Sequence, residues 1–320
     1  MSKVSVACAV LLLAACGPSA GGNTASDGAI VPGDGSGAHL DARFADAAPI
    51  GAHFRFGIVG DTRPPNINGT ASYPTATITK IWADLEAESP HPDFAVSTGD
   101  YMFASTTSTQ QKPQLDKYLG ARAQFSTPEY AALGNHECTG ATTSNCGTGN
   151  HDGHTSNYDE FMSRMVMPLG FTEPYYAINF QDPSGAWTAK LVLVAANAWT
   201  TAQATWLEQT LAQPTTYTFI VRHESNSAST APGVTPSKHI IDAHPYTILI
   251  VGHAHTYQHV ASDREVICGT GGAPLTSGAN YGYAIVERLD SGDIQFTQRD
   301  YQSLAVADRW RVHADGSPAP

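Results

Sequence analysis

The fold of this chain is decided by the stretch Tyr246-Thr247-Ile248-Leu249-Ile250-Val251-Gly252-His253-Ala254-His255. Its first six residues are short, rich in branched side chains and stopped by a glycine, which predicts a buried β-strand. If the extended backbone continues, the side chains of His253 and His255 project to the same side, roughly 6–7 Å apart at the backbone. That spacing suits two imidazole ligands, one on each of two adjacent metal ions.

Four earlier apolar segments also end in polar side chains that bind metals. They are the predicted strands 54–59, 94–97, 130–133 and 217–221, which lead to Gly60-Asp61, Gly99-Asp100, Gly134-Asn135-His136-Glu137 and Arg222-His223. In α/β sheets, functional sites gather at the carboxyl ends of strands. Five strands ending in this way therefore predict one shared metal site.

Helical patterns alternate with these strands. An apolar stripe at Ile78, Ile81, Trp82 and Leu85 predicts a core-facing helix, and further helices are expected near 115–119, 158–165, 205–211 and 238–243. Strands are expected at 175–180 and 190–196, and a hairpin at 283–297 around Ser291-Gly292. This order predicts an α/β protein with mixed sheets.

Composition leaves most functions open. The chain has 320 residues, of which 42% are hydrophobic and 14% charged, enough for one large domain or two small ones. Its formal net charge of -12 argues against a nucleic acid partner, because phosphate backbones are bound by clustered Lys and Arg. An acidic protein can still act on phosphate esters if metal ions supply positive charge locally.

The N-terminus predicts export. Residues 1–15 have the basic start and short apolar core of a secretory signal, and Leu13-Ala14-Ala15-Cys16 resembles the cleavage box of bacterial lipoproteins. We expect Cys16 to be lipidated and residues 16–50 to be a flexible Gly/Ala/Ser linker, with a globular domain over 51–312 and a disordered tail over 313–320. An ordinary signal peptide with a chance cysteine is the alternative. The expected location is the bacterial cell envelope, at the outer membrane or on its periplasmic face, with the lipid as the only membrane contact.

Three cysteines remain in the expected mature chain. Cys138 and Cys146 bracket a polar, Gly-rich loop short enough to close, and export makes a disulfide between them the favoured prediction. Cys268 is expected to be a buried free thiol in a strand at 265–268.

The order of the polar blocks resembles the calcineurin-like metallophosphoesterase superfamily. The segments His253-Ala254-His255-Thr256-Tyr257 and Gly269-Thr270-Gly271-Gly272-Ala273-Pro274 look most like its purple-acid-phosphatase branch. The resemblance implies a four-layer α/β/β/α sandwich of two mixed sheets. It also implies an exported enzyme that hydrolyses phosphate monoesters or diesters of a small phosphorylated substrate.

The same resemblance implies two divalent or trivalent transition metals, iron, zinc or manganese. Asp61, Asp100 and His255 would hold the first, and Asp100, Asn135, His223 and His253 the second. A metal-bound hydroxide would attack phosphorus. His136 would stabilise the transition state or protonate the leaving oxygen.

Two positions depart from the family pattern. Arg63 stands where the family has a histidine ligand, and Phe103 where purple acid phosphatases have a tyrosine. The first metal is therefore expected to bind weakly, to be completed by water or to be absent, leaving one tightly bound ion. Arg63 either grips a substrate phosphate oxygen or is a surface residue or internal partner for a carboxylate. His259 is a second candidate substrate contact. The alternative function is a catalytically silent, metal-binding lipoprotein that uses the fold as a binding module.

Overall fold

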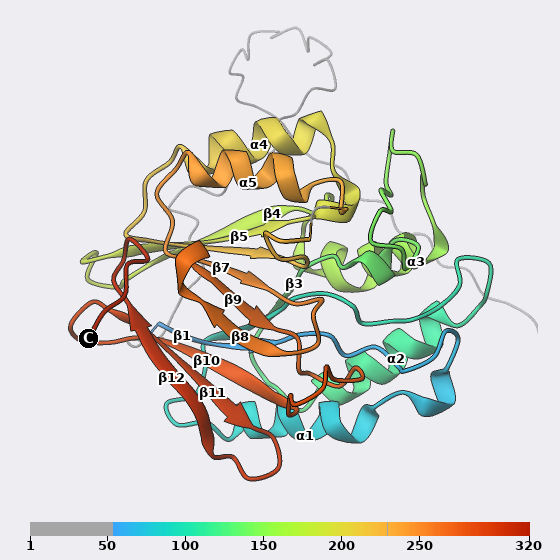
Figure 1. Cartoon of the computed structure of the whole chain (residues 1–320), viewed down its shortest axis with the longest axis horizontal. Helices are drawn as coiled ribbons and strands as arrows, with labels where there is room; N and C mark the ends of the chain where they lie inside the picture. The colour runs from blue at the N-terminus through green and yellow to red at the C-terminus, as the bar shows by residue number, and fades with distance from the viewer. Residues whose placement is uncertain (1–53, 229) are drawn as a thin grey trace, which may run out of the picture. The chain divides into compact units, whose positions relative to one another are not determined.

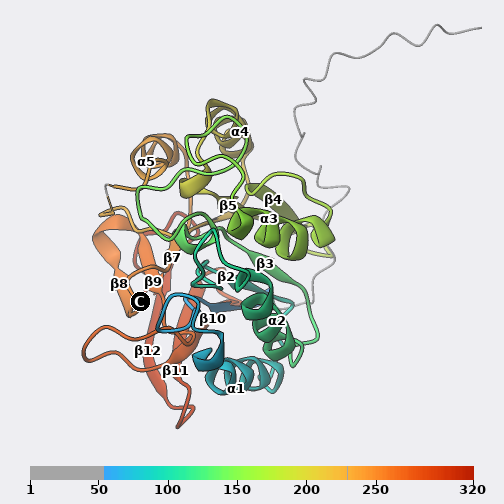
Figure 2. The ribbon, with the colours of Figure 1, turned by 90° about the vertical axis from the view of Figure 1, so that its right-hand side faces the viewer.

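Two six-stranded sheets lie face to face in the computed structural model, which describes residues 54–228 and 230–320 (Figure 1). Helices cover the outer face of each sheet, as Figure 2 shows from a second direction. The predicted four-layer α/β/β/α sandwich of mixed sheets is confirmed. The predicted signal peptide, the linker and Cys16 lie outside the described residues.

The first sheet combines three parallel strands with an antiparallel meander. Its strands, in spatial order, are β12 (Val306–Val312), β11 (Ile294–Asp300), β10 (Gly282–Arg288), β1 (Arg55–Val59), β2 (Phe94–Ser97) and β3 (Glu129–Ala131). Strands β1, β2 and β3 run parallel, whereas β10 pairs antiparallel with β1.

The second sheet has four parallel strands between two antiparallel edges. Its order is β4 (Tyr176–Gln181), β5 (Thr188–Val194), β6 (Tyr217–Arg222), β7 (Ile248–Val251), β9 (Glu265–Cys268) and β8 (Tyr257–Val260). Strand β7 reads Ile-Leu-Ile-Val and is buried at every position. A continuous apolar run is what a parallel strand covered on both faces requires.

The helices of the described chain are α1 (Thr75–Glu86), α2 (Gln111–Arg122), α3 (Ser156–Phe161), α4 (Thr201–Leu211) and α5 (Val234–Asp242). Four of them lie on connections between parallel strands, and α3 lies on the connection from β3 of the first sheet to β4 of the second. Helix α3 continues as a π-helical turn, Met162–Val166. Single 3-10 turns are found at Thr70–Ser72, Asn135–Glu137, Met167–Leu169, Ala196–Ala198 and Ala261–Asp263. In the part of the chain that the structure describes, no helix has the length and apolar character needed to span a membrane.

Aromatic rings fill the space between the sheets. The rings of Phe94 and Phe180, from opposite sheets, stack with centroids 4.7 Å apart, and Phe56 meets Phe219 edge-on at 5.2 Å. The predicted stripe on α1 is also fully buried, but against the outer face of the first sheet, where Leu85 lies over Gly57 of β1. The aromatic contacts between the sheets fix the two sheets against each other and keep the carboxyl ends of their strands close together.

The C-terminal residues are ordered, so the prediction of a disordered tail over 313–320 is wrong. The backbone N–H of His313 donates to Ser317, and Ala319 donates to Arg311 of β12. The hydroxyl of Thr247 also donates to the carbonyl of Ala314. These bonds tie the tail to the edge strand β12 of the first sheet and to the residue before β7 of the second, a tertiary effect that the Gly/Ser/Pro composition of the tail does not reveal.

Candidate metal centre

The carboxyl ends of strands from both sheets bring six predicted metal ligands together. Asp61 follows β1, Asp100 follows β2, and Asn135 opens the 3-10 turn after β3. From the second sheet, His223 follows β6 directly, while His253 and His255 follow β7. Side chains from two different sheets therefore form one cluster.

Four of these ligands have left-handed backbone conformation. The φ angles are 55° at Asp61, 60° at Asp100, 67° at His253 and 50° at His255. Such values are uncommon for residues other than glycine and concentrate at functional sites. The expectation that strand alternation continues through His253 and His255 is wrong, because β7 ends at Val251. The tight turn, not the strand pleat, aims both imidazoles.

Four donor atoms meet in one subsite. The Nε2 atom of His223 lies 3.1 Å from Asn135 Oδ1, 3.2 Å from Asp100 Oδ1 and 3.1 Å from His253 Nδ1. His253 Nδ1 is also 3.1 Å from Asn135 Oδ1. Two ligands at right angles on bonds of about 2.1 Å would lie about 3 Å apart. The spacing therefore fits a single transition-metal ion.

Neighbouring carbonyls fix which atoms face inward. Nδ1 of His223 donates to the carbonyl oxygen of Thr98 at 2.8 Å, so Nε2 is the atom that faces the cluster and would bind a metal ion once its own proton has left. The amide of Asn135 donates to the carbonyl of Gly140 at 2.6 Å, which turns Oδ1 toward the cluster. Several acceptor lone pairs converge with few protons between them. A cation satisfies them all, so these residues suit a metal.

A second subsite has fewer donors. Asp61, Asp100 and His255 place one ligand atom each within 4.8 Å of one another. Nε2 of His255 lies 3.5 Å from Asp61 Oδ1, and its Nδ1 bonds the carbonyl of Pro274 at 2.6 Å. The backbone N–H of His253 donates to the Asp61 carboxylate at 2.9 Å. Asp100 belongs to both subsites and can bridge two ions.

The Glu137 side chain supports this arrangement, although the sequence pattern predicted no role for it. Its buried carboxylate accepts backbone N–H bonds from Asp100, Tyr101 and Gly134 at 2.8, 2.8 and 3.0 Å. It thereby holds the turn that carries Asp100. Its place at the end of the block Gly134 to Glu137 was the only available signal.

Two glycines permit the close approach of these segments. A Cβ atom at Gly134 would lie 2.4 Å from Asp100 Oδ1, and one at Gly252 would lie 2.4 Å from Asp61 Oδ2. Real side chains do not tolerate such distances. Glycine is therefore required on steric grounds at both positions.

Burial and charge set the protonation of the cluster. Burial raises the pKa of Asp61 to about 7 and lowers the pKa of His136 and that of His253 to about 4. Burial also opposes the charge on His223, but the adjacent Asp100 carboxylate outweighs it and raises the His223 pKa well above its usual range. His253 is thus neutral at pH 7, as a ligand must be, and a metal ion binding here would displace a proton from His223.

His136 and Arg63 flank the shared carboxylate. His136 Nε2 lies 3.8 Å and Arg63 Nε 3.6 Å from Asp100 Oδ2. The Phe103 ring lies between them in contact with both, 4.5 Å from the His136 ring and 4.8 Å from Arg63 Cζ. Within the described ranges, the His136 ring makes no hydrogen bond, and its buried Nδ1 has no partner. The ion pair with Asp100 makes Arg63 an internal partner of a carboxylate at the site, rather than a surface residue.

His259 is not brought to this cluster. It pairs with Val266 across β8 and β9, and its ring stacks on Trp310 of β12 with centroids 3.6 Å apart.

Cys138 and Cys146 are joined in a disulfide with Cα atoms 5.6 Å apart. Cys268 is a buried free thiol at the end of β9.

The family model for calcineurin-like phosphoesterases matches residues 54–257, which include all six clustered ligands. The chain belongs to this family. No curated protein matches it in sequence.

Solved structures share the fold at low sequence identity. Purple acid phosphatase PPD1 from yellow lupin (Lupinus luteus) seeds has a TM-score of 0.59 and 15% identity, over 86% of this chain and 58% of that one. GAP50, described as the anchor in the inner membrane complex of Plasmodium, has a TM-score of 0.56 and 13% identity, over 83% of this chain and 90% of that one.

Proposed function

We propose that this protein hydrolyses small phosphate esters, monoesters or diesters, at the candidate metal centre. The observation that carries the proposal is the convergence of Asp100, Asn135, His223 and His253 at 3.1–3.2 Å beside an unbonded His136. Iron, zinc or manganese ions, when bound, would neutralise charge on the phosphoryl oxygens and activate the attacking water.

His136, Arg63 and Asn135 would each make a separate contribution to catalysis. His136, with its imidazole held against Phe103, would give a hydrogen bond or a proton to the leaving oxygen. Arg63 would hold a phosphate oxygen with its guanidinium, which already lies next to the shared Asp100. Asn135 contributes a neutral oxygen, which keeps the summed negative charge low enough for an anionic substrate to approach.

The two subsites would differ in affinity. One offers four side-chain donors, whereas the other offers Asp61, Asp100 and His255 and has the Arg63 guanidinium beside it. Phe103 supplies no ligand atom. We therefore propose one tightly held ion at Asp100, Asn135, His223 and His253 and a second, weaker one.

Substitution of His136 tests this function. His136→Ala should lower kcat for p-nitrophenyl phosphate by about 10²- to 10⁴-fold, the usual contribution of a general acid, with metal content unchanged by elemental mass spectrometry. His259→Ala is the matched control, because its ring lies on Trp310, and it should leave kcat and KM unaltered. Turnover that persists in His136→Ala would refute the role of His136.

A metal-binding module without catalysis is the second candidate. The substitutions at Arg63 and Phe103 favour it, and so does the fold shared with GAP50, described as a membrane-complex anchor. Full metal loading with no turnover of monoesters or diesters would support this alternative.

We further propose export and anchoring through a lipid on Cys16, which would place the domain in the bacterial envelope. The signal-like segment and its cleavage box support this proposal. Metabolic labelling with palmitate should mark the wild-type chain and not Cys16→Ala; equal labelling of both would exclude Cys16 as the lipidation site.

A further inference from the structure

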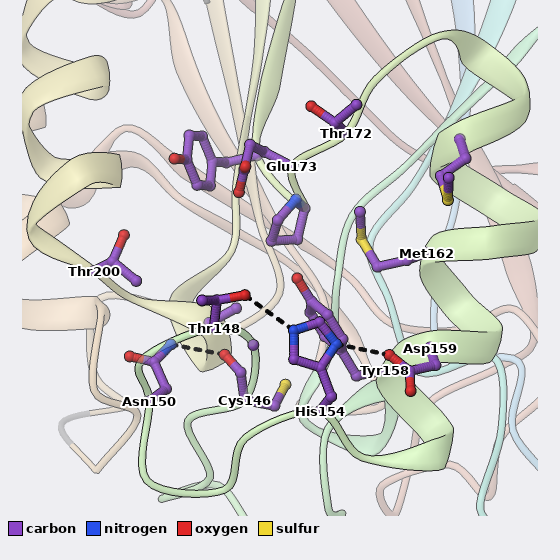
Figure 3. A pocket seen from close by; sticks show the side chains of 15 residues that line it. Cys146, Thr148, Asn150, His154, Tyr158, Asp159, Met162, Thr172, Glu173 and Thr200 are labelled. Atoms are coloured by element: carbon purple, nitrogen blue, oxygen red, sulfur yellow. Dashed lines mark hydrogen bonds and ion pairs between the residues drawn. The ribbon is translucent and has the colours of Figure 1, made fainter. Parts of the chain in front are cut away.

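A cavity of about 410 Å³ lies between four segments of the described chain (Figure 3). Its walls come from the loop 146–154, from α3 with its π-helical turn, from 172–175 before β4, and from 198–200 before α4. Its volume is within the range of small-molecule sites, about 300–1,000 Å³. None of the six clustered ligands lines it, so it is separate from the metal centre.

Three side chains of the wall form a continuous chain of hydrogen bonds. Nε2 of His154 lies 3.0 Å from the hydroxyl oxygen of Thr148, and Nδ1 of the same ring lies 2.9 Å from Asp159 Oδ1, as Figure 3 shows. A carboxylate can only accept a hydrogen bond, so in the neutral ring Nδ1 carries the proton and Nε2 accepts from the Thr148 hydroxyl. The order hydroxyl, imidazole, carboxylate is the one that activates the nucleophile of serine hydrolases.

The loop that carries Thr148 is held by its own backbone. Cys146, two residues earlier, is disulfide-bonded. The N–H of Gly147 donates to the carbonyl of Gly153 at 2.9 Å, which closes the loop between Thr148 and His154. The hydroxyl and the imidazole are therefore fixed relative to each other before a ligand enters, as positioned catalytic groups must be.

Backbone donors are available beside the Thr148 hydroxyl. Gly147 and Gly149, on either side of it, have φ angles of 92° and 82°, so the chain turns sharply at this point. Among residues 54–228 and 230–320, no acceptor is bonded to the N–H of Thr148 or to that of Gly149. Such N–H groups stabilise the oxyanion that forms when a hydroxyl attacks a carbonyl carbon.

The rest of the wall suits a small polar molecule. Polar side chains outnumber apolar ones, and Asn150, Thr172 and Thr200 add amide and hydroxyl groups to the three hydrogen-bonded residues. Met162 and Pro174 offer a limited apolar area. A carboxylic ester with a short acyl group matches this lining, because its polar oxygens lie next to a small apolar part.

We propose that this cavity is a second hydrolytic site, which cleaves carboxylic esters of short acyl groups without a metal ion. Oγ1 of Thr148 bonds to the acyl carbon while its proton moves to Nε2 of His154, and Asp159 stabilises the resulting imidazolium. The bond from the acyl carbon to the alcohol oxygen then breaks, and the proton passes from Nε2 to that oxygen. Water attacks the acyl-threonine by the same route, which releases the acid and restores the hydroxyl.

Hydrolysis of p-nitrophenyl acetate by the full chain in EDTA tests this proposal. Thr148→Val and His154→Ala should each lower kcat/KM by about 10²-fold or more, the usual contribution of a general base, whereas Thr148→Ser should retain activity. Both side chains are exposed, so these changes should leave folding intact. Because any exposed imidazole reacts slowly with this ester, His151→Ala is the matched control: His151 lies on the same loop, pairs with Asp152 and does not line the cavity. Its rate should equal that of the wild type.

Two further readouts distinguish a triad from a reactive surface. Diisopropyl fluorophosphate, which forms a stable adduct with an activated hydroxyl, should label Thr148 in the wild type and not in His154→Ala, as read by peptide mass spectrometry. The acetate ester should be hydrolysed at least tenfold faster than the octanoate, because most of the wall is polar.

Equal rates in the wild type and His154→Ala, an unlabelled Thr148, or faster hydrolysis of the octanoate would overturn the proposal. Loss of acetate hydrolysis in EDTA or in His136→Ala would place the reaction at the metal centre and overturn it as well. The proposal does not depend on the proposed phosphoesterase function, so acetate hydrolysis should persist in His136→Ala whether or not that function is found.

Discussion

Replacement of Glu137 by glutamine tests how much the hydrogen bonds of its carboxylate stabilise the turn that carries Asp100. One carboxylate oxygen accepts the N–H groups of Asp100 and Gly134 at 2.8 and 3.0 Å. The other accepts those of Tyr101 and Met102 at 2.8 and 3.3 Å. Glutamine has the same shape, but its NH₂ group cannot accept, so one pair of backbone donors would face another donor.

The loss can be worked from these bonds. Above pH 8, where Glu137 is ionised, hydrogen bonds to its charged carboxylate contribute about 1.5–3 kcal/mol each, so losing one pair costs about 3–6 kcal/mol. Burial raises the pKa of Glu137 to about 8, which shows that burying its charge is unfavourable and that a neutral amide recovers part of the loss. We expect a net decrease of about 3 kcal/mol in the free energy of unfolding, a large share of the about 5–15 kcal/mol typical of a domain.

Glu224→Gln is the matched control. Glu224 is also fully buried, but within residues 54–228 and 230–320 its two carboxylate oxygens have no hydrogen-bond partner. The same change there removes no hydrogen-bond acceptor and should therefore cost less than Glu137→Gln.

Urea unfolding above pH 8, in the presence of EDTA, measures both variants with Glu137 ionised and without a contribution from metal binding. Equal losses in the two variants, or no loss in Glu137→Gln, would refute the reasoning.

Two further perturbations address the metal subsites. Phe103→Tyr places a phenolic oxygen beside the cluster and should raise the retained metal from about one equivalent per chain toward two. Elemental mass spectrometry after dialysis measures this content. An unchanged metal content would show that a tyrosine at this position cannot reach the ion. Gly134→Ala should abolish tight metal binding, because its Cβ would lie 2.4 Å from Asp100 Oδ1. Gly120→Ala, in open space inside α2, should instead stabilise the fold by about 0.5–1 kcal/mol in urea unfolding and keep the metal. Metal loss in both glycine variants would contradict the steric argument.

The sequence by itself determined the alternation of strands and helices, the strand ends and the ligand types, whereas the four layers followed from the family resemblance. Apolar runs such as Ile248 to Val251 specify buried strands locally, and the polar residues that follow these runs specify which side chains lie at the carboxyl ends of the strands. Metal chemistry restricts those residues to Asp, Asn and His, so the six ligands were recognisable without coordinates.

Only the tertiary structure decided how these side chains are aimed. The proton position on His223 depends on the Thr98 carbonyl, 125 residues earlier in the chain. In the same way, Glu137 and Arg63 are placed by their contacts with Asp100 in the turn after β2, and His259 by its contact with Trp310 of β12. The 410 Å³ cavity exists only where four separate segments meet. Local patterns record burial and backbone preference, whereas contacts between distant segments depend on the packed core that brings them together.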